Sequence, residues 1–537
     1  MTVFPYLRDV GTEVTGMARQ ARVNVEELRK GGVVKLREED MFSIWVKTAC
    51  CNLNSEQLLE LADIIERHGR GYLLFTTRQI PIIPFVKLED VPEVKEELAQ
   101  VYLELDRCGP RVRNVNVCYE DKICPQAVTN AISLAERLDV FFRDPIQHKI
   151  KLGAAGCPRD CIISRVLTDI GFVGVGNDGT RGYYDVYVGG RLGLNPFLGL
   201  KMATRLSEEA CIRFTQNYFD LMKSQGKEGE RAADLINRLG AERVRRELSL
   251  DLDAEPPGGC ITCETRLKDR ETDKTILRIR ATCGEVTANQ LRKIAFIASR
   301  YGLGFVHFAV RGSPEIPGVD DKDMPDIEAE LAEVGLKTLD GGIDNLQSCF
   351  GSYCTESNVD PQSLLRRIEA RVAELGLNDG NNIRISAAGC PNSCGIAQLN
   401  DIGFYGVAEP IVDASECNGC GLCRQVCRRQ AIEIRDKLAV IDREKCADCG
   451  RCIAVCPFGG MVLRRSGFAV FVGGQEGEDT RLGTEIGRFL SEDEALEAAE
   501  GSLRLIQELG SSAAAIIDDV GLERFKEMLN KGGADGS

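Results

Sequence analysis

The stretch HGRGYLLFTTRQIPIIPFV at 68–86 aligns without a gap with YGLGFVHFAVRGSPEIPGV at 301–319. Glycines, an arginine and two prolines coincide at a constant offset of 233 residues. The same offset relates LGAAGCPRDC at 152–161 to ISAAGCPNSC at 385–394. Self-similarity at a fixed offset is the signature of an internal repeat. The sequence therefore predicts two copies of one unit, related by a pseudo-twofold axis.

The alignment of the two copies shifts in their last third. TDIGFVGV at 168–175 matches NDIGFYGV at 400–407 at an offset of 232, whereas VYVGGRLG at 186–193 matches VFVGGQEG at 470–477 at 284. The difference of 52 residues predicts an insertion in the second copy. Each copy reads as strand, helix, strand, a cysteine-bearing segment and closing helices, which predicts a mixed α/β (α+β) fold.

A helix is predicted to begin at equivalent positions of the two copies. Asn54 is followed three residues later by Gln57, and Thr287 is followed three residues later by Gln290. This spacing, directly before an apolar periodic segment, predicts a capping box at each helix start.

Composition limits the classes of function. The chain has 537 residues, a formal net charge of −15, and 23 cysteines against 3 histidines. The acidic balance argues against nucleic acid or an anionic membrane as partner. No apolar run approaches the ~20 residues of a spanning helix, and the N-terminus lacks a secretory signal. Three histidines leave little room for His-ligated metals, so the cysteines predict a cytoplasmic protein whose thiolates bind metal.

Eight cysteines lie within the inserted segment, in two runs of the form C-x2-C-x2-C-x3-C. This is the pattern of bacterial ferredoxins with two [4Fe–4S] clusters, in which the last cysteine of each run binds the other cluster. One cluster is assigned to Cys417, Cys420, Cys423 and Cys456. The other is assigned to Cys446, Cys449, Cys452 and Cys427. Paired zinc sites are the alternative, which the order of the eight thiols disfavours.

Two further sets of four cysteines lie at corresponding places in the copies. The first copy has Cys118, Cys124, Cys157 and Cys161. The second has Cys349, Cys354, Cys390 and Cys394. The spacing, with GCPNSC and a following DIG, resembles the cluster motif of the sirohaem-dependent sulfite and nitrite reductases. The ferredoxin-like insert is similar to that of the dissimilatory-type sulfite reductases.

The resemblance implies specific cofactors. It implies a [4Fe–4S] cluster on each set, hence up to four clusters in the chain, and one or two sirohaems. It also implies that Cys394 bridges its cluster to a sirohaem, and that Cys161 does the same if a second sirohaem is present.

The resemblance also implies which side chains bind the substrate anion. The family's basic residues fall on four positions of the first copy: Arg78, Arg113, Lys149 and Lys151. Cationic donors around an open axial position would hold the oxygens of sulfite. In the second copy the corresponding positions hold Arg311, Asp344, Asn382 and Arg384. Because an Asp and an Asn replace basic residues there, we expect the first-copy basic set and the second-copy cluster to form the catalytic site.

The function implied is six-electron reduction of sulfite to sulfide. Lys151 stands where the nitrite enzymes of the family tend to carry Asn, which favours sulfite over nitrite. A sirohaem nitrite reductase and a non-catalytic multi-cluster electron-transfer protein are the alternatives. Because no flavin or nicotinamide domain is visible, electrons are expected from an outside donor, a ferredoxin or a partner reductase subunit, through the insert. An oligomer is expected.

The repeat and the resemblance together predict the domain boundaries. They are an N-terminal extension at 1–32, a ferredoxin-like half-domain at 33–110, a sirohaem/[4Fe–4S] domain at 111–250, a linker at 251–271, a second half-domain at 272–342, a second sirohaem/[4Fe–4S] domain at 343–409 and 464–534, and the ferredoxin insert at 410–463. Cys260 and Cys263 lie in the linker and are interpreted as a linker feature.

Overall fold

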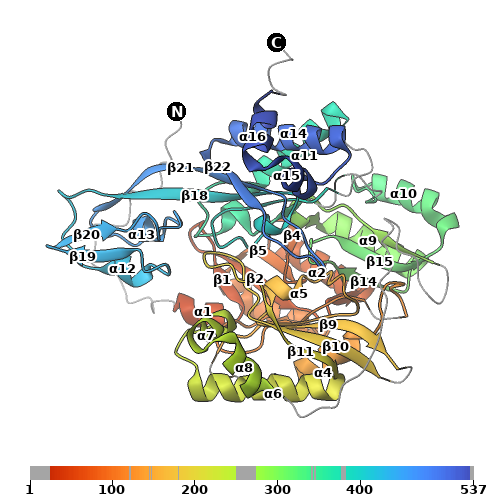
Figure 1. The fold of residues 1–537 in the computed structure, drawn as a ribbon. Helices are drawn as coiled ribbons and strands as arrows, with labels where there is room; N and C mark the ends of the chain where they lie inside the picture. Colours follow the sequence, from red (N-terminus) through yellow and green to blue (C-terminus); the bar gives the residue numbers. More distant parts are fainter. Residues whose placement is uncertain are drawn as a thin grey trace.

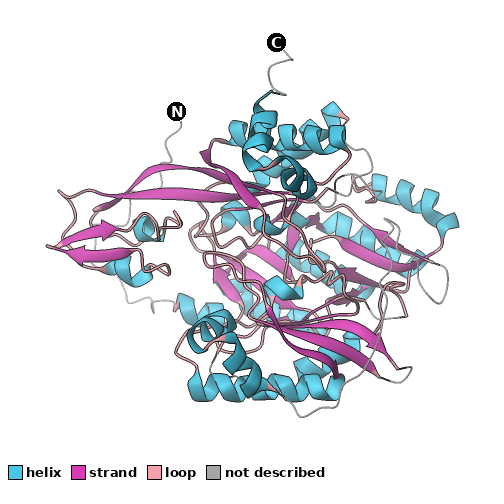
Figure 2. Ribbon diagram, in the orientation of Figure 1, coloured by secondary structure: helices cyan, strands magenta, loops and turns pink. Residues whose placement is uncertain are grey.

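The structure is a computed structural model and describes residues 24–119, 122–143, 146, 148–178, 181–249, 274–339, 343, 346–376 and 383–531. For residues 530 and 531 it describes the backbone only. Four residues singled out above lie outside this described part: Cys260, Cys263, Asp344 and Asn382. Helices and sheets alternate along both copies, which confirms the mixed α/β fold (Figure 2).

The two half-domains each contain an antiparallel sheet, and each sheet is completed by the other copy. The first sheet contains β1 (Val33–Lys35), β2 (Met41–Lys47), β5 (Pro81–Lys87), β4 (Tyr72–Phe75) and β6 (Glu104–Leu105), and β13 (Glu285–Thr287) from the second copy. The second sheet contains β12 (Thr275–Arg278), β15 (Pro314–Val319) and β14 (Phe305–Phe308), and β3 (Asn52–Asn54) from the first copy. The exchanged strands β3 and β13 are themselves 233 residues apart, so the pseudo-twofold axis passes between them.

A helix begins directly after each exchanged strand, as the capping boxes predict. In α2 (Ser55–Arg67) the Asn54 side chain accepts the amide hydrogen of Gln57, whose side chain accepts that of Asn54. Thr287 and Gln290 make the same reciprocal pair in α9 (Ala288–Tyr301). The two helices pack against each other and against both sheets, so the half-domains share one core. At the axis the rings of Phe75 and Phe308 stack with their centroids 3.9 Å apart.

Two larger mixed sheets carry the cysteine sets. In the first copy the order is β11 (Leu200–Ser207), β10 (Gly182–Val188), β9 (Ile170–Asn177), β8 (Leu152–Ala155) and β7 (Asn116–Val117). In the second it is β22 (Thr484–Leu490), β21 (Met461–Val472), β18 (Ile402–Val412), β17 (Ile385–Ala388) and β16 (Gln347–Ser348). In both sheets the first three strands along the chain are parallel and the last two antiparallel.

Helices cover these sheets on the outside of the molecule (Figure 1). The first copy contributes α4 (Ala131–Phe141), α6 (Glu208–Gln225), α7 (Ala232–Leu239) and α8 (Ala241–Leu248), whereas its short α5 (Ser164–Leu167) lies inside, against the second copy. The second contributes α11 (Pro361–Leu375), α14 (Glu492–Leu509), α15 (Ala513–Val520) and α16 (Leu522–Lys531). The half-domains add α1 (Val25–Lys30), α3 (Val91–Gln100) and α10 (Met324–Ala332). Short 3-10 turns lie at Leu88–Asp90, Thr282–Gly284, Asp321–Asp323, Gly351–Tyr353 and Ala397–Leu399.

The inserted segment projects from the second copy on a two-stranded ribbon. Strands β18 and β21 remain antiparallel partners out to Val412 and Met461, with one register shift between Glu409 and Pro410. At the tip of this ribbon lie α12 (Leu422–Val426), β19 (Ile432–Arg435), β20 (Leu438–Ile441) and α13 (Arg451–Ala454), at the left of Figure 1. The tip is fastened back to the ribbon where the amide of Ala408 donates to the carbonyl of Asp448 at 2.7 Å.

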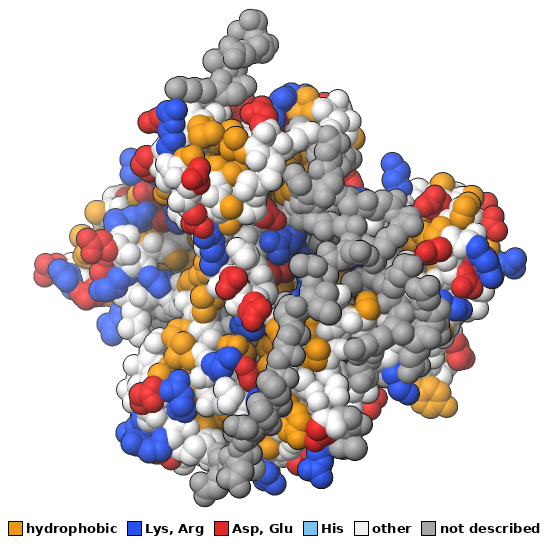
Figure 3. Space-filling model, turned by 45° about the vertical axis from the view of Figure 1, so that its right-hand side comes forward, with side chains coloured by type: hydrophobic (Ala, Val, Ile, Leu, Met, Phe, Trp, Pro, Cys, Tyr) orange, Lys and Arg blue, Asp and Glu red, His pale blue; other side chains and the backbone are white. Residues whose placement is uncertain are grey.

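The described surface mixes both signs of charge. Figure 3 shows acidic and basic side chains interspersed over one face of the molecule. No helix in the described ranges is long and apolar enough to cross a membrane.

Candidate active site

The structure brings the eight cysteines of the insert together in two groups. Cys417, Cys420, Cys423 and Cys456 line one cavity, three of them from the first run and one from the second. In the other group, burial raises the pKa of Cys452 to about 12, and the neighbouring Cys449 and Cys446 add to the rise. The pKa of Cys449 is also raised, chiefly by burial, and the nearby Cys427 adds to the rise.

The second-copy set also converges. Burial raises the pKa of Cys349 to about 12, with contributions from Cys394 and Cys354. Cys390 is raised well above its ordinary pKa by burial, by Cys394 and by Cys349. All cysteines of the described ranges are free thiols. Cys349, Cys354 and Cys390 are partly buried and Cys394 is exposed. Four converging thiols, three of which have a raised pKa, fit a bound iron–sulfur cluster, whose positive charge would hold them as thiolates.

The first-copy set has the same arrangement. Burial raises the pKa of Cys118, and Cys161, Cys157 and Cys124 each add to the rise. The amide of Gly156 donates to Cys118 Sγ at 3.0 Å. At the equivalent place in the second copy, the amide of Gly389 donates to Cys349 Sγ at 3.2 Å. Both sets are therefore built on the same backbone geometry.

Basic residues of the first copy lie against the cysteine set of the second. The hydroxyl of Thr77 donates to the carbonyl of Cys394 at 3.0 Å, which places the β4–β5 loop over this set. Next to it, Arg78 has its pKa lowered to about 10 by burial and by Arg113, while the Cys394 thiol opposes the shift.

Asp106 and Trp45 hold the two arginines. The Arg113 guanidinium is fully buried, donates to the Asp106 carboxylate through two nitrogens, and donates to Cys108 Sγ at 2.8 Å. Arg78 Nη2 lies 3.7 Å from the same carboxylate. The guanidinium carbons lie over the Trp45 indole, at 5.4 Å for Arg113 and 5.8 Å for Arg78. Because the Arg113 donors are already taken by Asp106 and Cys108, Arg113 helps to hold the pocket in shape and has few donors left for a ligand.

Two lysines complete the cationic group. Burial, Arg78 and Arg113 lower the pKa of Lys149 to about 8. Burial also lowers the pKa of Lys151 strongly, with Arg231 and Arg78 adding to the shift. Within the described residues neither ammonium has a carboxylate oxygen within 4.0 Å, and the nearby Asp169 is engaged by Arg231 through two hydrogen bonds of 2.8 Å.

Unsatisfied donors point to an anion at this place. The buried Nε1 of Trp45 and Nε of Arg78 have no hydrogen-bond partner among the described atoms. Buried donors and cations without partners are unfavourable unless a ligand satisfies them. The donor set is that of an oxyanion pocket, with charge-assisted hydrogen bonds available from Arg78, Lys149 and Lys151.

The equivalent pocket near the first-copy cysteines is closed by a carboxylate. Arg311, the counterpart of Arg78, donates to Asn400 Oδ1 at 2.7 Å and forms an ion pair with Glu476. Arg384, the counterpart of Lys151, pairs with Asp401 at 3.1 Å and with Glu476 at 3.6 Å. Glu476 thus takes the place that an anion would need. Its first-copy counterpart is Leu192 (RLG against QEG), so the alignment of the two copies already contained this signal.

The insert contacts the loop that follows Cys354 of the second-copy set. The Asn358 side chain donates to the carbonyl of Cys449 at 3.5 Å and to that of Gly406 at 3.4 Å. Glu356 forms an ion pair of 2.6 Å with Arg451 of α13. These two residues follow Cys354 in the chain, so one group of insert cysteines lies beside the second-copy set. Neither residue was predicted from the sequence, because nothing in its local pattern marks a contact with the insert.

Comparison with known proteins accounts for this geometry. Residues 108–255 and 341–533 match the family described as nitrite and sulphite reductase 4Fe-4S domain. Residues 34–101 and 268–334 match the nitrite/sulfite reductase ferredoxin-like half domain. Each family matches once in each copy of the repeat, which confirms the duplication.

Similar proteins include both kinds of reductase. The chain is 32% identical over 268 residues to the coenzyme F420-dependent sulfite reductase of Methanocaldococcus jannaschii, covering 48% of this chain but only 43% of that relative. It is 27% identical over 384 residues to the ferredoxin–nitrite reductase of Synechococcus elongatus, covering 66% of this chain and 74% of the relative. The solved structure of the Mycobacterium tuberculosis NirA protein shares the fold, with a TM-score of 0.69 at 19% identity over 90% of this chain and 88% of that one. The chain belongs to the nitrite and sulphite reductase 4Fe-4S domain family.

Proposed function

We propose that the protein is a sirohaem-dependent sulfite reductase that reduces sulfite to sulfide with six electrons. The observation that carries the proposal is the buried cationic pocket of Arg78, Lys149 and Lys151, whose lysines lack carboxylate partners in the described structure and whose loop lies on Cys394. Bound sulfite would be reduced to sulfide while its three oxygens leave as water, which requires both electrons and protons at the same place.

The cysteine sets and the cationic pocket fit the cofactors that the family uses. Cys349, Cys354, Cys390 and Cys394 would hold a [4Fe–4S] cluster, and Cys394 would also hold the sirohaem. Sirohaem, when bound, would supply electrons to the substrate. The protein's own part is to bind the anion's oxygens through Arg78, Lys149 and Lys151 and to keep these donors fixed through Asp106 and Trp45.

We infer an order for the electron path through the insert. Cys420 is exposed, so its cluster is accessible to an outside donor such as a ferredoxin or a partner reductase subunit. The cluster of Cys449 touches Asn358 near the second-copy set, so it would receive the electrons next. From there the path leads through the cluster of Cys354 to the sirohaem.

The first-copy cysteine set is proposed to have a structural role. Its pocket is filled by Glu476, and a carboxylate fixed between two arginines repels a second anion. A cluster on Cys118, Cys124, Cys157 and Cys161 is compatible with this, as is a second sirohaem that turns over no substrate.

A nitrite reductase is the second candidate. It is favoured by the similarity to the Synechococcus ferredoxin–nitrite reductase. Sulfite is favoured by Lys151, which adds a second lysine at a position where the nitrite enzymes tend to carry Asn. Steady-state rates with reduced methyl viologen, measured for sulfite and for nitrite on the same preparation, distinguish the two, and no turnover of either would leave the electron-transfer alternative.

The role of the pocket is tested by Lys151→Ala. We expect sulfite turnover to fall by at least about 100-fold, the scale seen when one preorganised donor is removed, while the haem absorption spectrum and the iron content stay unchanged. Lys322→Ala, at an exposed lysine of the second half-domain, is the matched control and should keep full activity. Retained turnover in Lys151→Ala would contradict the assignment.

A further inference from the structure

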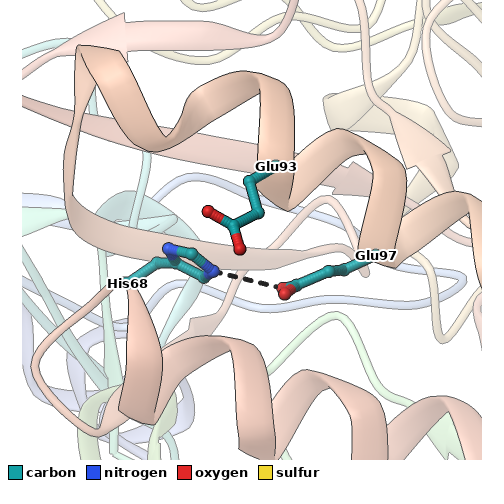
Figure 4. Close-up of side chains that lie close together, drawn as sticks. All are labelled: His68, Glu93 and Glu97. Carbon is teal, nitrogen blue, oxygen red and sulfur yellow. Dashed lines mark ion pairs between the residues drawn. The ribbon is translucent and has the colours of Figure 1, made fainter.

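Among the described residues, a cluster of side chains of the types that bind metals lies apart from the cysteines, at the junction of α2 and α3. His68 directly follows the last residue of α2, and Glu93 and Glu97 are four residues apart on α3, so that their side chains share one face of that helix. Figure 4 shows the imidazole and both carboxylates pointing toward one another. One ligand atom from each residue lies within 4.8 Å of the other two.

Two of these side chains are buried, and each has one buried atom without a hydrogen bond. His68 Nε2 and Glu97 Oε2 lie 3.3 Å apart, which is an ion pair when the imidazole is protonated (dashed line in Figure 4), and the two side chains are only 8% and 9% exposed. Neither atom makes a hydrogen bond in the described structure. The other carboxylate oxygen of Glu97 is bound by Arg67. Leaving a nitrogen and an oxygen buried in this way costs free energy, which a cation between them would recover.

We propose that His68, Glu93 and Glu97 form a binding site for a divalent transition-metal ion of the zinc class. One imidazole nitrogen and two carboxylate oxygens are ligands that Zn²⁺ accepts, and three protein ligands leave one tetrahedral position for water. A nitrogen ligand disfavours Mg²⁺ and Ca²⁺, which take oxygen ligands. Among the first-row ions, Zn²⁺ binds such a set more tightly than Mn²⁺. The positive charge of Arg67 beside Glu97 weakens the site, so the ion exchanges with solution.

The second copy provides an internal comparison, because it lacks the histidine. The positions equivalent to His68, Glu93 and Glu97 hold Tyr301, Asp326 and Glu330. There the Glu330 carboxylate is bound by the Lys293 ammonium. A phenol and a neutralised carboxylate make a poor ligand set, so the site is confined to the first copy. The ion would tie the end of α2 to α3 in one half-domain only.

The test measures zinc binding to the full-length holoprotein. Wild-type protein and the variants Glu93→Gln, His68→Tyr and Glu96→Gln are dialysed against Zn²⁺, and zinc and iron per chain are determined together by elemental analysis. His68→Tyr installs the residue found in the second copy. Glu96→Gln removes an exposed carboxylate from the same helix outside the trio, so it controls for the change of charge. Because Glu93 is exposed, its variant should fold even if His68→Tyr does not.

We expect zinc to bind to the wild type and Glu96→Gln equally and at least about tenfold more weakly to Glu93→Gln and His68→Tyr, at unchanged iron content. X-ray absorption at the zinc edge of the wild type should show nitrogen and oxygen ligands at about 2.0–2.2 Å, whereas zinc bound by stray thiols would show sulfur near 2.3 Å. Equal binding by Glu93→Gln and the wild type, or a sulfur shell, would overturn the proposal.

Discussion

At the scale of single residues, the two pockets differ in what balances their cations. In the first copy Asp106 binds Arg113, and no carboxylate of the described residues pairs with Lys149 or Lys151, whose pKa values are lowered. In the second copy Glu476 neutralises both Arg311 and Arg384. The eight insert cysteines could be predicted from their spacing, whereas the two other cysteine sets and the basic residues were implied by the family resemblance. Glu476 could not be assigned a role from spacing, since its effect depends on which side chain points into the pocket.

The charge of Lys149 predicts a pH dependence. Burial and the neighbouring arginines lower its pKa to about 8, so the ammonium loses its proton as the pH rises through that value. The KM for sulfite should therefore rise above about pH 8. In Lys149→Arg the cation should persist over this range, because a guanidinium holds its proton more tightly than an ammonium and even the buried Arg78 keeps a pKa of about 10, so this rise should be absent. KM measured between about pH 7 and pH 9 on both proteins checks the prediction, and an identical rise in both would assign the ionisation to another group.

Glu476 and Leu192 occupy equivalent positions in the two copies. Exchanging them should move the carboxylate that neutralises the basic residues from one pocket to the other. Gly193 lies against the backbone of Asn392, which places Leu192 beside the second-copy cysteine loop. Leu192→Glu should therefore neutralise the pocket of Arg78, Lys149 and Lys151 and reduce sulfite turnover by at least about 100-fold.

The reciprocal variant is the control. Glu476→Leu should leave turnover unchanged and cost at most about 3–5 kcal/mol of unfolding free energy, because it removes a carboxylate from the buried Arg311 and from Arg384, which keep their contacts with Asn400 and Asp401. Chemical denaturation and a viologen-linked assay measure both effects. Loss of turnover in Glu476→Leu with none in Leu192→Glu would reverse the assignment of the two pockets.

At the scale of elements, the ribbon of β18 and β21 carries the insert, which also contacts the loop after Cys354. The capping boxes and the position of the insert were predicted from the sequence, because both depend on local spacing. The exchange of β3 and β13 was not, since a three-residue strand carries no signal of which sheet it joins. The antiparallel pairing of the ribbon extends out to Val412 and Met461, with one register shift between Glu409 and Pro410, so the two strands already meet at the base of the insertion.

Removal of the insert should therefore leave a folded protein. Replacing 413–460 by Asn-Gly joins Val412 to Met461, which already pair, through a two-residue hairpin turn. We expect iron to fall by about eight atoms per chain. Turnover with a protein donor should be lost, while turnover with reduced methyl viologen persists at the remaining cluster. If viologen-driven turnover is lost while the remaining iron is retained, the insert has a role beyond delivering electrons.

At the scale of the whole molecule, the two copies form one interlocked body. Each half-domain sheet contains a strand of the other copy, and one core includes side chains of both. The pocket proposed as catalytic likewise combines basic residues of one copy with the cysteines of the other. The repeat itself was predicted from the offset of 233, but this mutual completion follows only from the three-dimensional arrangement.

The interlocking predicts the behaviour of separated copies. A fragment of residues 24–250 and a fragment of residues 274–531 should each be insoluble or self-associated when produced alone, because each leaves a sheet edge and apolar helix surface uncovered. Produced together, they should form a heterodimer with the iron content of the intact chain. Light scattering and elemental analysis check this, and two stable monomers would show that the shared core is dispensable.

The strand exchange between β3 and β13 has a consequence for ancestry. A protein of half this length would complete its sheet only by pairing with an identical molecule, and every change in it would then appear twice. Joining the halves in one chain released them from that constraint. The second half could then gain the insert with its eight cysteines while the first half kept the basic residues of the anion pocket. Two sites that began as identical could in this way take on different roles.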